Sequence, residues 1–270
     1  MYTTRFIHFK KEILMKYILT ILLILVFIVI FLFYNYYSPP RLYNPYSTKE
    51  HEDTFRIAFI GDSWAFFHRN HECEIAQLLK NHTHRPIKVH TFGICGLTSK
   101  EIYTSILNHY DFIDFFQKRH YEVCYVSAGI NDTYKKMSTR YYKQSMEGII
   151  QFLLSNNIHP IIQEIPDYNI HEAYKRQSTY RKIMRQFSML INGTSIDCKQ
   201  QFRNALDELI HEKGYEKEIS VIRYNTWNND YTNDLNRLYW PEGMHLNEIG
   251  YSVLDSMIAK TIIEDVLHNK

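Results

Sequence analysis

The stretch Phe55-Arg-Ile-Ala-Phe-Ile-Gly-Asp-Ser63 joins a short, mostly apolar run to a turn that ends in a serine. A short apolar run that ends at a glycine is typical of a buried strand in a parallel sheet. Four further runs resemble strands, and segments with helix-like spacing stand between them. Strands that alternate with helices predict an α/β fold, a parallel sheet with helices on both faces. The four further runs lie at 87–92, 121–128, 160–165 and 220–224.

The segments between these runs predict the helices. Thr98 followed by Glu101 has the spacing of a capping box, so a helix is expected to begin there. The other expected helices lie at 64–80, 141–155, 171–191, 197–213 and 247–268.

Polar residues follow the predicted strands at the edge where open parallel sheets bind their ligands. The first strand ends in Gly61-Asp-Ser63, and the third ends in Gly129-Ile-Asn-Asp132. The second leads through Gly93 to Thr98, and the loop after the fifth carries Glu242-Gly-Met-His245. These groups are therefore expected to lie together at the carboxyl edge of the sheet.

The residue types at this edge suit nucleophilic catalysis. A serine needs a base to act as a nucleophile at neutral pH, and the base needs a group that orients it. His245 is the base candidate, and Glu242, three residues earlier, is spaced to reach one imidazole nitrogen while the other faces Ser63. Developing negative charge needs donors, which the Ser63 N–H, the Gly96 N–H and the Asn131 amide are placed to supply.

The ordered set Gly-Asp-Ser, Gly, Gly-x-Asn-Asp and acid-x-x-His resembles the four sequence blocks of the SGNH/GDSL hydrolase superfamily. The resemblance covers about residues 55–265. It implies a flavodoxin-like three-layer α/β/α fold with a five-stranded parallel sheet. It also implies Ser63 as nucleophile, His245 as base, and Ser63, Gly96 and Asn131 as oxyanion-hole donors. Asp62 and Asp132 are expected to support the site from behind.

One position departs from the pattern of this superfamily. Its members usually carry Asp three residues before the histidine, where this chain has Glu242. Glutamate has the same charge and acceptors and serves as the triad acid in other serine hydrolases. We therefore expect Glu242 to be the acid, with Asp234 as the nearest alternative.

The composition excludes several classes of protein. The 270 residues are 45% apolar and 22% charged, which excludes a disordered chain and a small disulfide scaffold. Residues 1–40 hold four basic residues and one acidic residue, whereas residues 41–270 hold 27 basic and 28 acidic ones. The body of the chain therefore lacks the basic excess expected of a nucleic-acid-binding protein. The 14 histidines form no recognisable metal set, and neither a metal nor a cofactor is expected.

An apolar run at the N-terminus predicts a membrane anchor. Tyr17–Tyr34 is apolar or aromatic except at Thr20, and all four basic residues of the first 40 precede it. This arrangement predicts an N-terminus in the cytoplasm and a body outside it, although a cleaved signal peptide is the rival interpretation. The expected organisation is a basic flank at 1–16, a transmembrane signal anchor at 17–37, a linker at 38–53 and a hydrolase domain at 54–270.

Together these features predict an extracytoplasmic serine esterase. The expected substrates are O-acyl esters, above all O-acetyl esters, on carbohydrates of the cell envelope or elsewhere. An O-acyltransferase that uses the same site is one alternative, and a catalytically inactive glycan-binding or assembly module is another. Lipid esters are a further option, although the sequence shows no large apolar lid.

Overall fold

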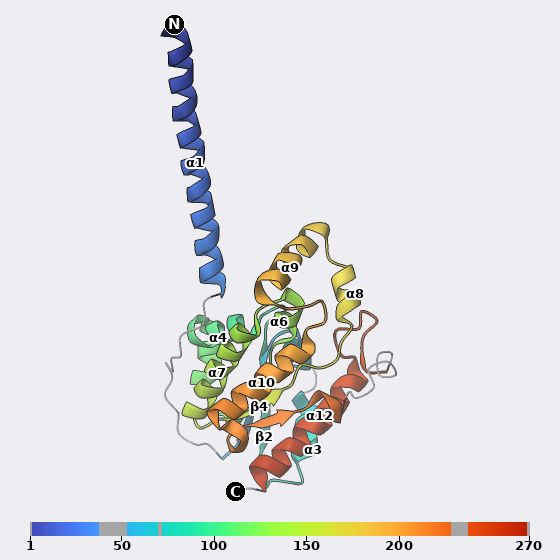
Figure 1. Cartoon of the computed structure of the whole chain (residues 1–270). Coiled ribbons are helices and arrows are strands. Elements are labelled where there is room, and N and C mark those ends of the chain that lie inside the picture. The colour runs from blue at the N-terminus through green and yellow to red at the C-terminus, as the bar shows by residue number, and fades with distance from the viewer. Residues whose placement is uncertain (1, 38–52, 70–71, 228–236, 269–270) are drawn as a thin grey trace. The chain divides into compact units, whose positions relative to one another are not determined.

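The computed structural model describes residues 2–37, 53–69, 72–227 and 237–268 and separates into two units, residues 1–39 and 40–270. The first unit is helix α1 (Tyr2–Tyr37) (Figure 1). Within it, Ile13–Phe31 has a mean hydropathy of 3.0 and is long enough to cross a membrane. A signal sequence near an N-terminus has the same length and composition.

The second unit is built on a sheet of five strands, all paired in parallel. Their spatial order is β2-β1-β3-β4-β5. The chain runs outward from β1 to β2 and then crosses back to β3, so the direction of winding reverses between β1 and β3. This is the flavodoxin-like order, and the predicted fold class is confirmed. The strands are β1 (Phe55–Gly61), β2 (Ile87–Gly93), β3 (Val123–Ser127), β4 (His159–Gln163) and β5 (Ser220–Ile222).

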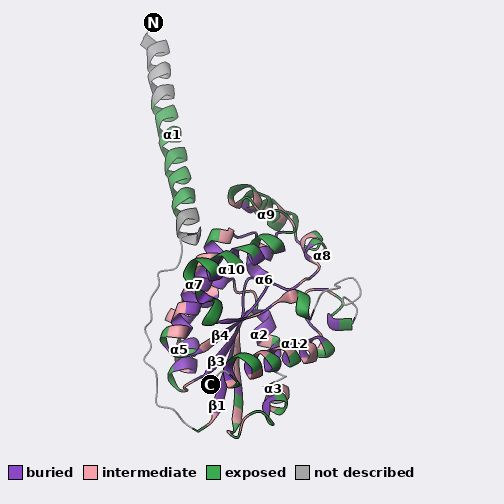
Figure 2. Ribbon diagram, turned by 60° about the horizontal axis from the view of Figure 1, so that its bottom comes forward, coloured by how far each residue is buried: buried purple, intermediate pink, exposed green. Residues whose placement is uncertain are grey.

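Helices cover both faces of this sheet (Figure 2). One face of the sheet carries α2, α3 and α12, among which α12 packs against α3 and α2 packs against β2. The other face carries α4, α5, α7 and α10, with α7 packed between α4 and α10. The first group is α2 (Ser63–His68), α3 (Glu72–Leu79) and α12 (Glu248–Thr261), and the second is α4 (Ser99–Asn108), α5 (Tyr110–Gln117), α7 (Thr139–Ser155) and α10 (Lys199–Lys213). Shorter or peripheral helices are α6 (Ile130–Lys135), α8 (Ile170–Lys175), α9 (Thr179–Asn192), the 3-10 turns Tyr215–Lys217 and Tyr224–Thr226, and a π-helical end at Ile262–Leu267.

The burial of each strand explains how apolar its sequence is. Every residue of β1 and β3 is buried, because these central strands have neighbours on both sides and helices on both faces. The edge strand β2 is only partly buried, and its sequence accordingly mixes polar and apolar residues.

The helix expected at 64–80 is interrupted in the structure. Helix α2 ends at His68, whose ring is buried and hydrogen-bonds to Asp255 of α12, and α3 begins at Glu72. Apolar spacing continues through both helices, so periodicity alone could not show the break. The predicted capping box is confirmed, since Glu101 Oε2 accepts from the Thr98 N–H at 2.7 Å and Thr98 Oγ1 accepts from the Glu101 N–H at 3.3 Å.

Candidate active site

Ser63 is the first residue of α2 and directly follows the end of β1. At Gly61 φ is +153°, and a Cβ built there would lie 2.1 Å from the carbonyl oxygen of Ser127 in β3, so this close approach requires glycine. The Asp62 N–H donates to that carbonyl at 3.2 Å, and the Asp62 carboxylate caps α2 by accepting from the Trp64 N–H at 3.0 Å. The chain therefore turns sharply here and places Ser63 at the start of a helix.

Ser63, His245 and Glu242 form one hydrogen-bonded chain. Nε2 of His245 lies 3.0 Å from Ser63 Oγ, and Nδ1 of His245 lies 2.9 Å from Glu242 Oε1. The side chain of His245 is 24% exposed and that of Glu242 is 38% exposed, whereas Ser63 is 7% exposed. In this geometry the imidazole can take the serine proton while the carboxylate stabilises the imidazolium.

The turn that carries Glu242 and His245 is fixed at both ends. The Trp240 N–H donates to the His245 carbonyl and the Gly243 N–H donates to the Trp240 carbonyl, each at 2.8 Å. The indole N–H of Trp64, next to the nucleophile candidate, donates to the Met244 carbonyl at 3.1 Å. These bonds hold the acid and the imidazole at a constant distance from the start of α2.

Asn131 lies near the start of α6, after Gly129, whose φ of +109° starts the turn. The Asn131 amide donates one N–H to Asp62 Oδ2 at 3.1 Å. An amide nitrogen carries two N–H donors, so the second can still reach a substrate oxygen. Asp62 therefore joins the start of α2 to Asn131 and orients its amide.

Asp132 connects the loop of Gly96 to α6. Its carboxylate accepts from the N–H and the hydroxyl of Ser99, each at 2.7 Å, and Ser99 is the first residue of α4. Gly96 has φ of +83°, in the left-handed region that favours glycine, and a Cβ there would meet nothing within 4 Å. Glycine is therefore needed at this position for the backbone conformation and not for space. Gly93 differs, because its Cβ would lie 2.2 Å from the Phe66 nitrogen, so it is a packing glycine.

The two aspartates behind the site are fully buried and their acidities are shifted. Burial raises the pKa of Asp62 to about 7, although hydrogen bonds from Trp64, Ser127 and Asn131 oppose the shift. Burial likewise raises the pKa of Asp132 to about 6, against the two hydrogen bonds from Ser99. For both aspartates, the rise in pKa caused by removing the carboxylate from water is therefore larger than the fall caused by the surrounding hydrogen-bond donors.

The shift at Asp62 predicts a pH dependence of stability. Because the folded-state pKa lies above the unfolded value of about 3.9, the folded chain holds an extra proton between about pH 4 and pH 7. The stability that this group contributes is thus fully present below about pH 4 and is lost as the pH rises through about 7, by about 2–3 kcal/mol between pH 5 and pH 7. We expect Asp62→Asn, which keeps a good N-cap, to flatten this part of the curve.

This expectation is checked by melting the full chain in detergent at pH 5 and at pH 7.5. The wild type should lose more Tm between the two pH values than Asp62→Asn does. Asp114→Asn, at a partly exposed carboxylate, should behave like the wild type. Equal losses for wild type and Asp62→Asn would contradict the shifted pKa.

The position of Asn131 predicts a catalytic defect. We expect Asn131→Ala to lower kcat for p-nitrophenyl acetate by about 10²–10³-fold, the loss typical of one oxyanion-hole donor. Asn108→Ala, which removes an amide from the exposed end of α4, should have wild-type kcat. If Asn131→Ala lowers kcat by less than about threefold, Asn131 is not an oxyanion-hole donor.

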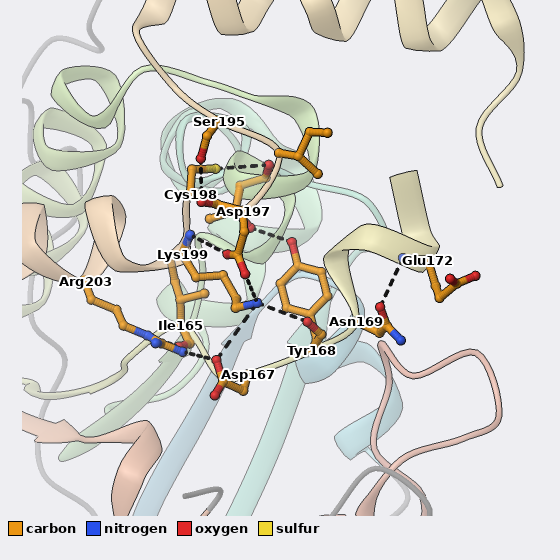
Figure 3. A network of polar contacts seen from close by, with 12 residues as sticks. Ile165, Asp167, Tyr168, Asn169, Glu172, Ser195, Asp197, Cys198, Lys199 and Arg203 are labelled. Atoms are coloured by element: carbon orange, nitrogen blue, oxygen red, sulfur yellow. Dashed lines mark hydrogen bonds and ion pairs between the residues drawn. The ribbon is translucent and has the colours of Figure 1, made fainter. Parts of the chain in front are cut away.

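A buried polar network supports the site, and sequence reasoning missed it (Figure 3). The Lys199 ammonium donates to the Tyr168 carbonyl at 3.2 Å and to Asp197 at 3.0 Å. Arg203 donates to the Ile165 carbonyl at 2.8 Å and to Asp167 at 2.9 Å. The first turns of α10 therefore hold the loop between β4 and α8.

That loop in turn holds the turn of the candidate triad. The Asn169 N–H donates to the Gly243 carbonyl at 2.9 Å, and the Tyr239 hydroxyl donates to the Asp167 carbonyl. Lys199 and Arg203 are basic residues that are almost completely buried, which their sequence neighbours do not indicate. The only signal in the sequence was the cluster of charged residues at the start of a predicted helix.

The remaining predicted features can be located in the structure. Gly96 follows β2, so the structure brings together the ends of three neighbouring strands, with the Glu242–His245 turn beside them. Asp234, the alternative acid, lies outside the described residues. Within the part of the chain that is described, no three His, Cys, Asp or Glu side chains gather closely enough to hold a metal ion.

This chain resembles known proteins in structure but not in sequence. No protein-family model matches the sequence, and no curated protein sequence is significantly similar to it. Solved structures, however, are similar with high probability. One is a GDSL-like lipase from Bacteroides thetaiotaomicron, with 14% identity, a TM-score of 0.50, and coverage of 77% of this chain and 87% of that one.

Two others have the same architecture. A lipase/acylhydrolase from Enterococcus faecalis has 14% identity and a TM-score of 0.53, with coverage of 77% of this chain and 95% of that one. An acetylxylan esterase from Geobacillus stearothermophilus has 16% identity and a TM-score of 0.53, with coverage of 80% and 95%. At these identities the likeness concerns the fold. The chain therefore has the α/β fold of the GDSL-type lipases, acylhydrolases and esterases.

Proposed function

We propose that this protein is a serine ester hydrolase with Ser63 as nucleophile, His245 as base and Glu242 as the acid that orients the base. The observation that carries the proposal is the continuous hydrogen-bonded chain from Glu242 through His245 to Ser63. The fold shared with GDSL-type esterases supports it, because the site lies at the carboxyl edge of the sheet, where such folds bind ligands.

The reaction proceeds through an acyl-serine. Ser63 Oγ bonds to the ester carbonyl carbon while its proton passes to His245 Nε2, and the N–H groups of Ser63, Gly96 and Asn131 bind the oxyanion. The intermediate collapses as His245 returns the proton to the leaving alcohol. Water then loses a proton to His245 and attacks the acyl carbon. The second intermediate collapses as the bond between the acyl carbon and Ser63 Oγ breaks and His245 returns the proton to Ser63 Oγ, which releases the carboxylic acid.

We propose O-acetyl esters of carbohydrates as the substrate class. Similarity in fold to an acetylxylan esterase supports this choice, and so does the N-terminal apolar helix, which as an anchor would keep the domain close to envelope polymers. The test measures acetate released by the full chain from acetylated xylo-oligosaccharides, with and without free sugar acceptors. Acetate release by the wild type is the expected result. Transfer to the acceptor without acetate would favour the acyltransferase, and no reaction would oppose both.

We further propose that residues 17–37 anchor the chain, with residues 1–16 in the cytoplasm and residues 54–270 outside. The basic residues that precede the apolar segment support this orientation. Protease added to intact cells should digest the body and spare roughly the first 16 residues. A soluble mature chain that starts after Tyr37 would show instead that the segment is a cleaved signal.

A further inference from the structure

Helix α9 presents its apolar side to solvent. Six large apolar or aromatic side chains recur at spacings of three and four residues and so share one side of the helix. Their exposed fractions run from 38% at Met184 to 81% at Leu190, and Figure 2 shows the helix largely in the colour of exposed residues. The six are Tyr180, Ile183, Met184, Phe187, Leu190 and Ile191.

The opposite side of α9 is polar and packs on the body of the domain. Ser188 is buried, Arg185 donates to the Lys135 carbonyl at 3.1 Å, and Asn192 donates to the Lys136 carbonyl at 2.8 Å. A surface helix normally turns its apolar stripe toward the core and its polar side to water. Helix α9 has the reverse arrangement, so its apolar side is free to contact something other than the domain.

The charge around α9 indicates the chemistry of that occupant. Residues 170–192 carry five basic residues and only one acidic residue, Glu172, whereas residues 41–270 as a whole carry one more acidic than basic residue. An occupant that suits this segment is apolar where it meets the exposed stripe and anionic beside it. The basic residues are Lys175, Arg176, Arg181, Lys182 and Arg185. Lys175 pairs with Glu172 and Arg185 bonds to the body of the domain, so the charge that an anionic occupant can meet comes from Arg176, Arg181 and Lys182.

A bilayer with anionic lipids has both properties. Its acyl boundary accepts an apolar helix side, and its headgroups attract the flanking Lys and Arg side chains. A second copy of this chain fits less well, because a symmetric contact through α9 would bring two basic segments together. We propose that α9 lies in the membrane interface, with Phe187, Leu190 and Ile191 buried at the level of the headgroup–acyl boundary.

The segment between the apolar helix and the domain is short enough to keep the domain near a membrane. With Ile13–Phe31 in a bilayer, the 16 residues of 38–53 extend at most about 55 Å, so the domain stays close to the membrane. Helix α9 also contacts the end of α6, the short helix that begins beside Asn131. Docking through α9 would therefore hold the carboxyl edge of the sheet in a set orientation to the lipid surface, whatever reaction occurs there.

The test places a photoreactive probe on the apolar side of α9 in the full chain. Leu190 is replaced by p-benzoylphenylalanine, the protein is reconstituted into phosphatidylcholine vesicles with or without phosphatidylglycerol, and lipid adducts are mapped by mass spectrometry after irradiation. The matched control carries the same probe at His211, which is 89% exposed near the end of α10 that leads to β5. Neither position belongs to the candidate active site.

We expect lipid adducts at position 190 and not at position 211. The yield at 190 should be at least about fivefold higher with phosphatidylglycerol, since each basic residue near an anionic surface favours binding. Phe187→Gln with Ile191→Gln should lower that yield several-fold. Adducts between two copies of the chain at position 190, equal lipid labelling at 190 and 211, or no lipid adduct at 190 would each overturn the proposal.

Discussion

Ser63→Ala should abolish ester turnover, with kcat lower by about 10⁵–10⁶-fold, and His245→Ala should have an effect of the same size. Both follow from the hydrogen bond between His245 Nε2 and Ser63 Oγ at 3.0 Å, because the two side chains act as one unit and either loss removes the activated nucleophile. The double variant should therefore be no slower than either single variant. Turnover of p-nitrophenyl acetate by the purified full chain measures the effect.

The variants should retain the fold, which separates a catalytic defect from unfolding. Alanine suits the first turn of α2, and His245 lies in a partly exposed turn and not in the core. Their Tm values should stay within a few degrees of the wild type. Ser256→Ala, which removes a hydroxyl from the exposed side of α12, is the matched control and should retain wild-type kcat. Near-wild-type turnover by Ser63→Ala would end its assignment as the nucleophile.

Glu242→Gln should lower kcat by up to about 10⁴-fold. The carboxylate accepts from His245 Nδ1 at 2.9 Å, and the amide can favour the wrong imidazole tautomer without stabilising the imidazolium. Glu242→Asp keeps the charge and should lower kcat less, although its side chain is one methylene shorter and reaches less far toward the ring. The measurement is kcat for p-nitrophenyl acetate across the set of variants.

Asp234→Asn completes this set, because Asp234 is the alternative acid in the sequence. It should leave kcat nearly unchanged if Glu242 orients His245. A severe loss in Asp234→Asn together with a mild loss in Glu242→Gln would show that the acid is Asp234. The pattern across the three variants decides the question more firmly than any single value.

The centre of the sheet could be predicted because β1 and β3 are buried on both faces. Residues 55–60 and 121–128 are mostly apolar for that reason, and the structure has β1 and β3 at these runs. The edge of the sheet could be predicted as well, since parallel strands bring their carboxyl ends together however distant they are in sequence. The roles assigned to Ser63, His245 and Glu242 stay predictions that the variants above test.

Other features depend on contacts between distant segments, which local patterns do not contain. The end of α2 at His68 coincides with a buried hydrogen bond to Asp255, 187 residues later. The buried positions of Lys199 and Arg203 depend on carbonyl groups in the loop between β4 and α8. One helix was expected over 171–191, where the structure has two, α8 and α9. Periodicity also cannot show that the apolar side of α9 faces outward.

Reaction of the full chain with a fluorophosphonate probe tests the central claim most directly, because this reagent modifies a serine only where a base has activated it. Peptide mapping of the labelled wild type should locate the adduct on Ser63, and labelling should disappear in Ser63→Ala and fall strongly in His245→Ala. An unlabelled wild type, or an adduct on another serine with Ser63 unmodified, would contradict an activated nucleophile at the end of β1.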